Sequence, residues 1–326
     1  MARSTLGKIL SIWTAIALAL IYGLVAFFVF RYNTLKELFG VMNLAYIFMV
    51  PFAIGAITIF LTDRKVKHST LFRVFVPWIP IGFLVLLVAA FAWEGLICVV
   101  MILPSFLGMA TVGGLLYGYV IDQKSSTSTK NLIFIGLLVL PFAASPLEQR
   151  LSTQDSFRQV QNSIVIEAEA EKVWQNIIRV PKIEESEHSF SFSHAIGFPR
   201  PVEASLTHEG IGGVRFASFE GNVLFVEMIT DWQNLKSLTF NIAADPDSIP
   251  QKTLDEHVTV GGPYFDVLQG HYEIEVLGPK QVRLNLSSTH RLSTHYNFYA
   301  SWWTDFIMSD IQSYILKIIK RRAEKV

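Results

Sequence analysis

One stretch of the chain brings together the residue types that general acid and base catalysis uses. Asp255 and His257 flank a glutamate, and Asp266 follows after a glycine turn. Two carboxylates near an imidazole could exchange protons with a substrate at neutral pH. The same side chains could instead cap turns by accepting hydrogen bonds from backbone amides, and the sequence favours this structural interpretation. They lie in a long irregular stretch, Ala244 to Gln269, and ordered loops of such length often carry function.

A second group of polar residues lies where the last predicted strand passes into the final helix. It consists of His290, Arg291, His295 and Asn297. Arg291 could clamp a phosphate or carboxylate headgroup with its planar guanidinium. It could equally pair with a carboxylate such as Glu273 or Asp266 and hold the loop closed. Both interpretations stay open, and we predict that His290 and Arg291 contribute to ligand binding.

Four histidines could in principle join Asp255 or Asp266 in a zinc site. They are His257, His271, His290 and His295. No pair of them has the compact helical spacing of a recognised metal motif. We therefore predict no metal and no other cofactor.

Arg200 and Glu227 are further candidates for ligand binding. Arg200 lies between two prolines that fix an extended backbone, so its side chain projects from a stiff loop where it could guard a pocket. Glu227 falls on the same strand face as the apolar residues two positions before and after it. Strict alternation therefore points its carboxylate inward, where it needs a partner. Arg215 or a loop residue could supply that partner.

The second half of the chain supplies the elements that must position these side chains. From Ser152 onward charges return and short apolar runs alternate with turn residues, which is typical of an antiparallel sheet. A first strand, Asn162 to Glu167, precedes a helix, Glu169 to Val180. Six further strands follow, at Glu203 to Glu209, Val214 to Glu220, Val223 to Asp231, Ser237 to Ala243, His271 to Leu277 and Val282 to Arg291. Glycine-containing turns between several of them suit tight hairpins.

A long helix from about Tyr296 to Lys325 closes the chain. Its apolar residues recur at three- and four-residue intervals, so one whole face requires burial. We interpret Trp302 and Trp303 as core anchors, one of which could line a ligand groove, and Phe306 as a further ligand contact. A strand, a helix, six strands and a long helix form the element order of the helix-grip fold. Its curled sheet wraps around the final helix and leaves either a packed core or an apolar pocket.

From Ser163 to Glu324 the sequence resembles the SRPBCC superfamily, which includes START lipid-transfer domains and polyketide cyclase and dehydrase-like proteins. The resemblance rests on the terminal helix and on Ile164-Val165-Ile166-Glu167-Ala168 followed by Glu171-Lys172-Val173-Trp174. Other stretches look like those of bacterial membrane-anchored members, namely Gly197-Phe198-Pro199-Arg200-Pro201, Val260-Gly261-Gly262-Pro263-Tyr264-Phe265-Asp266 and Ser288-Thr289-His290-Arg291-Leu292-Ser293-Thr294. The resemblance implies a START-like α+β domain that binds a hydrophobic or amphipathic molecule between sheet and helix.

The first half of the chain has the composition of a membrane-embedded helical region. The chain is 51% hydrophobic and only 17% charged, which is too apolar for two soluble domains of this size. Runs that approach the 20 or so residues needed to cross a bilayer lie at Ile9 to Phe30, Leu44 to Leu61, Phe75 to Ala92 and Leu96 to Ile121. A fifth run, Leu132 to Leu147, is short and holds two prolines, so it could span, re-enter or lie at the interface. We predict a transmembrane region of four to five spans over residues 1–150 and a soluble domain over residues 151–326.

Basic residues predict the orientation of this region. They cluster before the first run, after the second and after the fourth, and such clusters stay on the cytoplasmic side. The clusters are Arg3 with Lys8, Arg64 with Lys65, Lys67 and Arg73, and Lys124 with Lys130. With five spans the soluble domain faces outward, and with four it is cytoplasmic. We predict a bacterial inner-membrane protein with an inward amino terminus and an outward soluble domain.

Two glycines in the fourth run could pack a second copy of the chain. Gly114 and Gly118 form a GxxxG pair, which either marks a dimer face or reflects the glycine frequency of membrane helices. The net charge of zero provides no general attraction for nucleic acid, so we predict no nucleic-acid partner.

These observations favour a membrane-anchored module that binds a lipid, an isoprenoid or a similar molecule. A cyclase or hydrolase that uses Asp255, His257 or Asp266 on an apolar substrate is the alternative, and it requires a strongly perturbed acid or base. A third possibility is that the soluble domain regulates the helical bundle. Fold alone does not choose among these functions.

Overall fold

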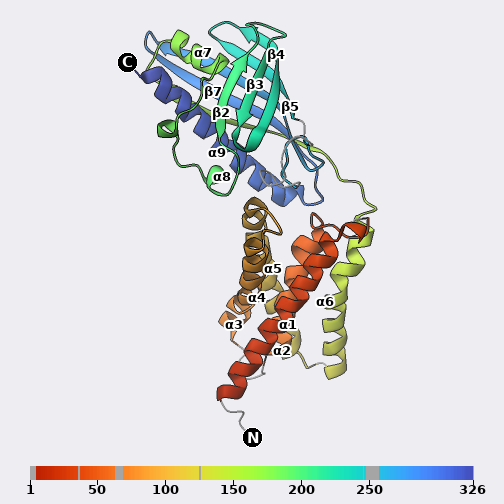
Figure 1. The fold of residues 1–326 in the computed structure, drawn as a ribbon. Helices are drawn as coiled ribbons and strands as arrows, with labels where there is room; N and C mark the ends of the chain where they lie inside the picture. The colour runs from red at the N-terminus through yellow and green to blue at the C-terminus, as the bar shows by residue number, and fades with distance from the viewer. Residues whose placement is uncertain are drawn as a thin grey trace. The chain divides into compact units, whose positions relative to one another are not determined.

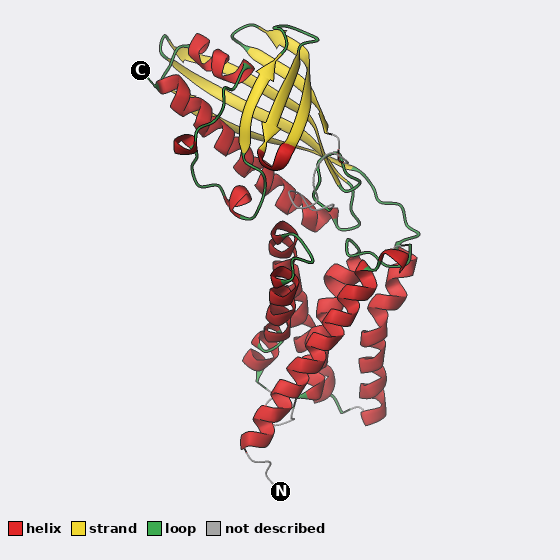
Figure 2. Ribbon diagram, viewed as in Figure 1, coloured by secondary structure: helices red, strands yellow, loops and turns green. Residues whose placement is uncertain are grey.

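The computed structural model describes residues 5–35, 37–62, 69–124, 126–244, 246 and 257–325. The chain divides into two compact units (Figure 1). The helical unit consists of Met1–Glu94 and Val99–Thr153, and the sheet unit consists of Gly95–Cys98 and Gln154–Val326. Figure 2 shows that helices make up the first unit and that the strands belong to the second.

The helical unit is built from apolar helices that alternate in direction. They are α1 (Thr5–Arg31), η2 (Ala45–Met49) with α2 (Val50–Leu61), α3 (Thr70–Phe75) with α4 (Trp78–Ala90), α5 (Leu96–Asp122) and α6 (Thr127–Glu148), and a short turn, η1 (Asn33–Leu35), follows α1. At one end, Arg31 forms an ion pair with Glu94, with 2.9 Å between Nε and Oε1. At the other end, Arg73 pairs with Asp122, with 2.7 Å between Nη2 and Oδ2. The chain therefore leaves α6 at the end opposite to the one where α1 begins.

Four helical segments in the described residues are long and apolar enough to cross a membrane. They are Ile9–Arg31, Thr70–Ala90, Leu96–Asp122 and Thr127–Glu148. The segment that the sequence left open, Leu132 to Leu147, thus belongs to a helix of 22 residues. The run from Leu44 to Leu61, which the sequence predicted as a span, forms a shorter apolar helix, Ala45–Leu61. Its first backbone amides donate to the Glu148 carboxylate, at 2.6 Å from Leu44 N and 3.0 Å from Ala45 N, where an anion complements the helix dipole.

The GxxxG pair packs inside its own chain. A Cβ atom at Gly114 would overlap the carbonyl oxygen of Arg73, and one at Gly118 would overlap the Arg73 side chain. These two glycines therefore let α3 approach α5 closely. Formation of a homo-oligomer stays a prediction, but this stripe of α5 is already covered by α3.

The sheet unit is a seven-stranded antiparallel sheet with a long carboxy-terminal helix, the arrangement of a helix-grip fold. Its elements are β1 (Ser156–Ile166), α7 (Ala170–Ile178), η3 (Glu185–Glu187), α8 (Phe192–Ala195), β2 (Pro201–Leu206), β3 (Val214–Phe219), η4 (Glu220–Asn222), β4 (Val223–Gln233), β5 (Ser237–Ala244), β6 (Phe265–Gly278), β7 (Gln281–Leu292) and α9 (Asn297–Glu324). The strands lie in the order β1-β7-β6-β5-β4-β3-β2. The predicted fold class and element order are confirmed, although β1 and β6 each begin six residues earlier than predicted.

The hydrophobic core of the sheet unit lies between the sheet, α7 and the last turns of α9. It includes Trp174, Ile177, Leu238, Tyr272, Ile274, Leu284, Leu316, Ile319 and Ala323. The turn between β3 and β4 uses positive φ at two successive residues, 71° at Gly221 and 63° at Asn222. Such turns match the twist of the strands they join, and glycine and asparagine adopt this conformation readily.

Candidate functional site

The inner face of the sheet changes from apolar to polar along the length of α9. Alternate residues of β7 face α9, because side chains along a strand point to opposite faces. Leu284 and Leu286 belong to the hydrophobic core. Farther along the same strand face, Ser288 accepts a hydrogen bond of 2.9 Å from Gln312 Nε2, and His290 lies near Asp305 in the first turns of α9. The interior therefore has an apolar end beside α7 and a polar end beside the start of α9.

A buried ion pair lies on this inner face. Arg215 on β3 is directly opposite Glu227 on β4, and the guanidinium and carboxylate are in contact. Each side chain is only 7% exposed. The inward orientation predicted for Glu227 is confirmed, and of the partners that the sequence left open, Arg215 or a loop residue, the structure shows Arg215. A role of Glu227 in ligand binding stays a prediction.

The surroundings of this pair act on both charges. Burial raises the pKa of Glu227, and the adjacent guanidinium opposes that rise. Burial alone would lower the pKa of Arg215, but the carboxylate keeps it above its ordinary value. The guanidinium carbon also lies 5.7 Å from the centre of the Phe240 ring, within cation–π range. The Nε atom of Arg215 is buried and has no hydrogen-bond partner among the described residues.

The Phe240 ring occupies the space where β6 carries no side chain. Phe240 on β5 is opposite Gly270 on β6, and a Cβ atom at Gly270 would overlap the ring. The ring centre is 6.1 Å from that of Tyr272. Gly270 thus allows Phe240 to lie beside Arg215 on the inner face.

We expect Gly270→Ala to lower the free energy of unfolding by about 1–3 kcal/mol, because the new methyl group must displace a buried ring. Gly278→Ala, at the end of the same strand, is the matched control, since a Cβ there meets nothing within 4 Å. It should change stability by less than about 0.5 kcal/mol. A urea titration of both variants measures the difference. Equal effects would show that Phe240 does not depend on Gly270.

His290 is the most buried polar residue of this face. Its side chain is fully buried, and neither ring nitrogen has a hydrogen-bond partner among the described residues. The Asp305 carboxylate lies 3.6 Å from Nε2, too far for a good hydrogen bond, and the Phe265 ring lies 5.6 Å from the imidazole. Burial lowers the pKa of His290, and Asp305 only partly opposes this effect. The ring is therefore neutral at pH 7 and offers one donor and one acceptor.

Polar side chains also fix α9 against β1 and β7. Arg158 donates to both carboxylate oxygens of Asp305. Asn162 donates to Gln312 Oε1 at 2.8 Å and accepts from Ser309 Oγ at 3.1 Å. These bonds satisfy the polar groups of both elements and hold the start of α9 in register with the sheet.

Arg291 holds a loop and does not project freely. Its guanidinium donates to the carbonyls of Gly262 at 2.8 Å and Pro263 at 3.3 Å, and Nη1 lies 3.7 Å from Asp155 Oδ1. These contacts fit the loop-closing interpretation, with backbone carbonyls and Asp155 as partners, and Arg291 also acts electrostatically on Asp266, its cross-strand neighbour. A role of Arg291 in ligand binding stays a prediction.

The predicted acid–base group falls only in part on the described residues. Asp255 lies outside the described residues. Asp266 accepts hydrogen bonds from the backbone amides of Gly261 and Val267, so it caps a turn as the structural interpretation expects; burial raises its pKa. The ring of His257 lies 6.0 Å from that of Tyr264. Catalysis by these residues therefore stays a prediction.

Arg200 lies at the surface and is held by two carboxylates. It donates through Nε to Glu220 at 2.8 Å and through Nη1 to Glu185 at 3.0 Å. These hydrogen bonds raise its pKa above the ordinary value. A function at a pocket entrance stays a prediction.

The aromatic residues at the start of α9 differ from the prediction. Trp302 is 78% exposed, so the prediction that it anchors the core is wrong. Trp303 is partly buried against Phe306, with ring centres 6.3 Å apart. Phe306 is 47% exposed and meets the edge of Phe192 at 5.4 Å. The periodicity of the helix predicts its apolar positions, but it does not show which of them the sheet buries.

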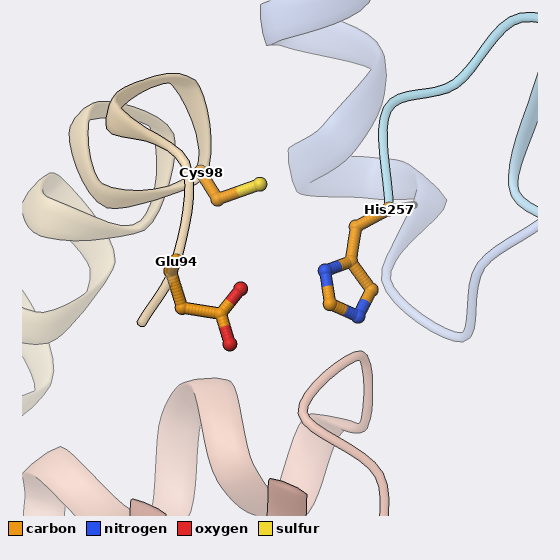
Figure 3. Close-up of side chains that lie close together, drawn as sticks. All are labelled: Glu94, Cys98 and His257. Atoms are coloured by element: carbon orange, nitrogen blue, oxygen red, sulfur yellow. The ribbon is translucent and has the colours of Figure 1, made fainter. Parts of the chain in front are cut away.

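Figure 3 shows Glu94, Cys98 and His257, three side chains of types that can bind metals. Glu94 belongs to the helical unit, whereas Cys98 and His257 belong to the sheet unit. Because this group draws on both units, we assign no metal site to it.

Comparison with known proteins gives structural matches that cover about half of the chain. No model of a known protein family matches, and no curated protein matches in sequence. A START superfamily protein from Mycobacterium smegmatis matches at 10% identity and a TM-score of 0.34, over 51% of this chain and 97% of that one. Truncated norcoclaurine synthase from Thalictrum flavum matches at 11% identity and a TM-score of 0.33, over 54% and 98%. The Zhui aromatase/cyclase from Streptomyces sp. R1128 matches at 13% identity and a TM-score of 0.32, over 52% and 94%.

Proposed function

We propose that this protein is a membrane-anchored binding module whose sheet unit takes up a hydrophobic or amphipathic molecule between the sheet and α9. The observation that carries the proposal is the set of buried polar atoms on the inner face that have no partner among the described residues, Arg215 Nε and the ring nitrogens of His290. Buried polar atoms in folded proteins are almost always hydrogen-bonded. A bound molecule with polar atoms at one end would satisfy them.

The two ends of the interior suit the two ends of such a molecule. The apolar core beside α7 would contact hydrocarbon, whose burial is favourable in proportion to its area. Arg215 and neutral His290 would hydrogen-bond oxygen atoms of the polar end. Small-molecule sites typically combine apolar walls with a few polar groups that orient the ligand.

The apolar helices of the first unit support a location in a membrane. Because the described helices alternate in direction, Arg73 and Lys130 lie at the end where α1 begins, and the chain enters the sheet unit from the opposite end. Basic residues stay cytoplasmic, so we propose that the sheet unit faces outward. In a bacterial host, alkaline phosphatase fused after Val326 should be active. Green fluorescent protein fused at the same position should not fluoresce, because it would be translocated across the membrane. The reverse pattern would place the sheet unit in the cytoplasm.

Filling the interior should remove the bound molecule. Met308 is buried on the same face of α9 as Asp305 and Gln312, which contact β1 and β7. We expect Met308→Trp to reduce the lipid-soluble material that co-purifies with the full chain by roughly tenfold, equivalent to about 1.4 kcal/mol of binding. Extraction and mass spectrometry, per mole of protein, measure it.

Lys317→Trp provides the matched control for this experiment. It places the same side chain on the exposed face of the same helix and should leave the bound amount unchanged. Equal loss in both variants would mean that tryptophan acts through general destabilisation. Equal retention would mean that the molecule does not lie between the sheet and α9.

A further inference from the structure

The first turns of α9 carry a stripe of exposed aromatic side chains. Phe298, Trp302 and Phe306 recur at four-residue intervals, which places them along one side of the helix. They are 70%, 78% and 47% exposed. The stripe spans nine residues of helix, whose eight steps of rise separate its ends by about 12 Å.

A loop extends this aromatic stripe sideways. Phe190, which precedes α8, is 82% exposed. The loop is fixed against α9 at this level, because Ser191 Oγ donates to Asp310 Oδ2 at 2.6 Å and Phe192 contacts Phe306. Contiguous exposed aromatic groups of this kind are unusual on a soluble surface and indicate an interaction site.

The tether to the helical unit reaches the sheet unit at the stripe. The Asn297 side chain, in the first turn of α9, donates to the backbone oxygen of Gln154 at 2.9 Å. The last apolar helix ends at Glu148. The six residues from there to Gln154 extend over about 20 Å at most. If α6 lies in a bilayer, the stripe cannot move far from that bilayer's surface.

The side-chain types fit the boundary between lipid and water. Tryptophan and phenylalanine combine a large apolar area with a rigid ring, and tryptophan adds an N–H group that can remain hydrated. Tryptophan is enriched at membrane interfaces for this reason, and phenylalanine and tryptophan are common on the apolar face of helices that lie in the interface. Farther along α9, the exposed Lys317 and Arg321 add cations that anionic headgroups attract.

We propose that the stripe of Phe298, Trp302 and Phe306, with Phe190, docks the sheet unit onto the surface of the bilayer that holds its own helices. Docking brings the start of α9, and with it Asp305 and His290, to the lipid surface. This inference rests on the proposed membrane anchoring but not on uptake of a ligand. A chain that failed to insert into lipid nanodiscs would refute the anchoring itself.

The test uses the full chain, labelled with fluorotryptophan, in nanodiscs of phosphatidylcholine and phosphatidylglycerol. The Trp302→Phe variant assigns the Trp302 signal in the fluorine spectrum. A nitroxide lipid labelled near the headgroup should broaden this signal, and a water-soluble paramagnetic agent should broaden it much less. Trp174, which is buried in the core, should respond to neither agent.

Each other outcome overturns the proposal. Broadening by the soluble agent alone would leave Trp302 in water. Protection from both agents would mean that protein covers the stripe, either the helical unit or a second copy of the chain.

Two aspartate variants separate docking from general exposure. Phe306→Asp should lower the docked population on the order of tenfold, because a buried phenylalanine contributes at least that factor, and the lipid-dependent broadening of Trp302 should fall accordingly. Phe157→Asp replaces an aromatic side chain on β1 that is also largely exposed, at 64%, and should leave the broadening unchanged. Equal effects of the two variants would contradict docking through the stripe.

Discussion

Replacing Glu227 alone with leucine should lower the free energy of unfolding by about 3–5 kcal/mol, because it leaves the buried Arg215 charge without a partner. The guanidinium stays protonated at neutral pH, so the free-energy cost of its unpaired charge remains. Both side chains are almost fully buried, so water cannot replace the lost carboxylate. A urea titration followed by near-ultraviolet circular dichroism, which reports the packed Trp174–Trp232 pair, measures the change.

The double variant Arg215→Met with Glu227→Leu is the control. Replacing both members of a buried pair with apolar side chains is often neutral or stabilising. We therefore expect most of the stability to return, which gives a large coupling energy between the two positions. A double variant as unstable as the single one would show that the unpaired charge is not the cause. If the double variant is stable but retains no bound molecule, the pair serves binding more than folding.

Glu187→Gln should remove about 3 kcal/mol of stability at pH 7 and almost none near pH 2. Arg322 donates to both carboxylate oxygens of Glu187, at 2.7 Å each. This hydrogen bonding, chiefly, lowers the pKa of Glu187 from 4.5 to about 2. Because the folded pKa is the lower one, the stabilisation is complete above pH 4.5 and is lost as the pH falls towards 2. The size follows from 1.36 kcal/mol for each pH unit.

Glu185→Gln is the control for this experiment. Glu185 also contacts an arginine, Arg200, but its side chain is 80% exposed, and exposed ion pairs contribute little. Its replacement should change stability by less than about 1 kcal/mol at any pH. Thermal unfolding of both variants between pH 2 and pH 7 provides the comparison. A loss for Glu187→Gln that is independent of pH would contradict the role of its charge.

The parts of the sheet unit that the sequence predicts best are those whose inner faces are apolar. Alternation of apolar residues around Glu227 predicts its inward orientation and its need for a partner, but it leaves Arg215 and a loop residue as alternatives. The first six residues of β1 are not predicted, because their inward positions include Arg158, whose partner Asp305 lies far away on α9. A strand that packs its polar side chains against a polar helix face shows no hydrophobic alternation. The polar end of the interior escapes prediction for the same reason.

The helical unit and the start of α9 show a second limit. Apolar periodicity locates the helices of the first unit, but it cannot show that Gly114 and Gly118 pack against Arg73 within the chain. Apolar periodicity also cannot distinguish Trp302, which is exposed, from the buried apolar residues of α9. The part of this helix that extends beyond the sheet exposes side chains of the same type. Periodicity identifies the apolar faces of such helices, and packing decides which of them are covered.

The proposed binding of a hydrophobic or amphipathic molecule is tested most directly by the mass of the intact full chain after gentle release from detergent. We expect a species heavier than the polypeptide by the mass of one non-protein molecule, in stoichiometric amount in the wild-type chain and roughly tenfold less abundant in Met308→Trp. A wild-type chain that carries no such mass, and that takes up none when incubated with a membrane lipid extract, would contradict the account.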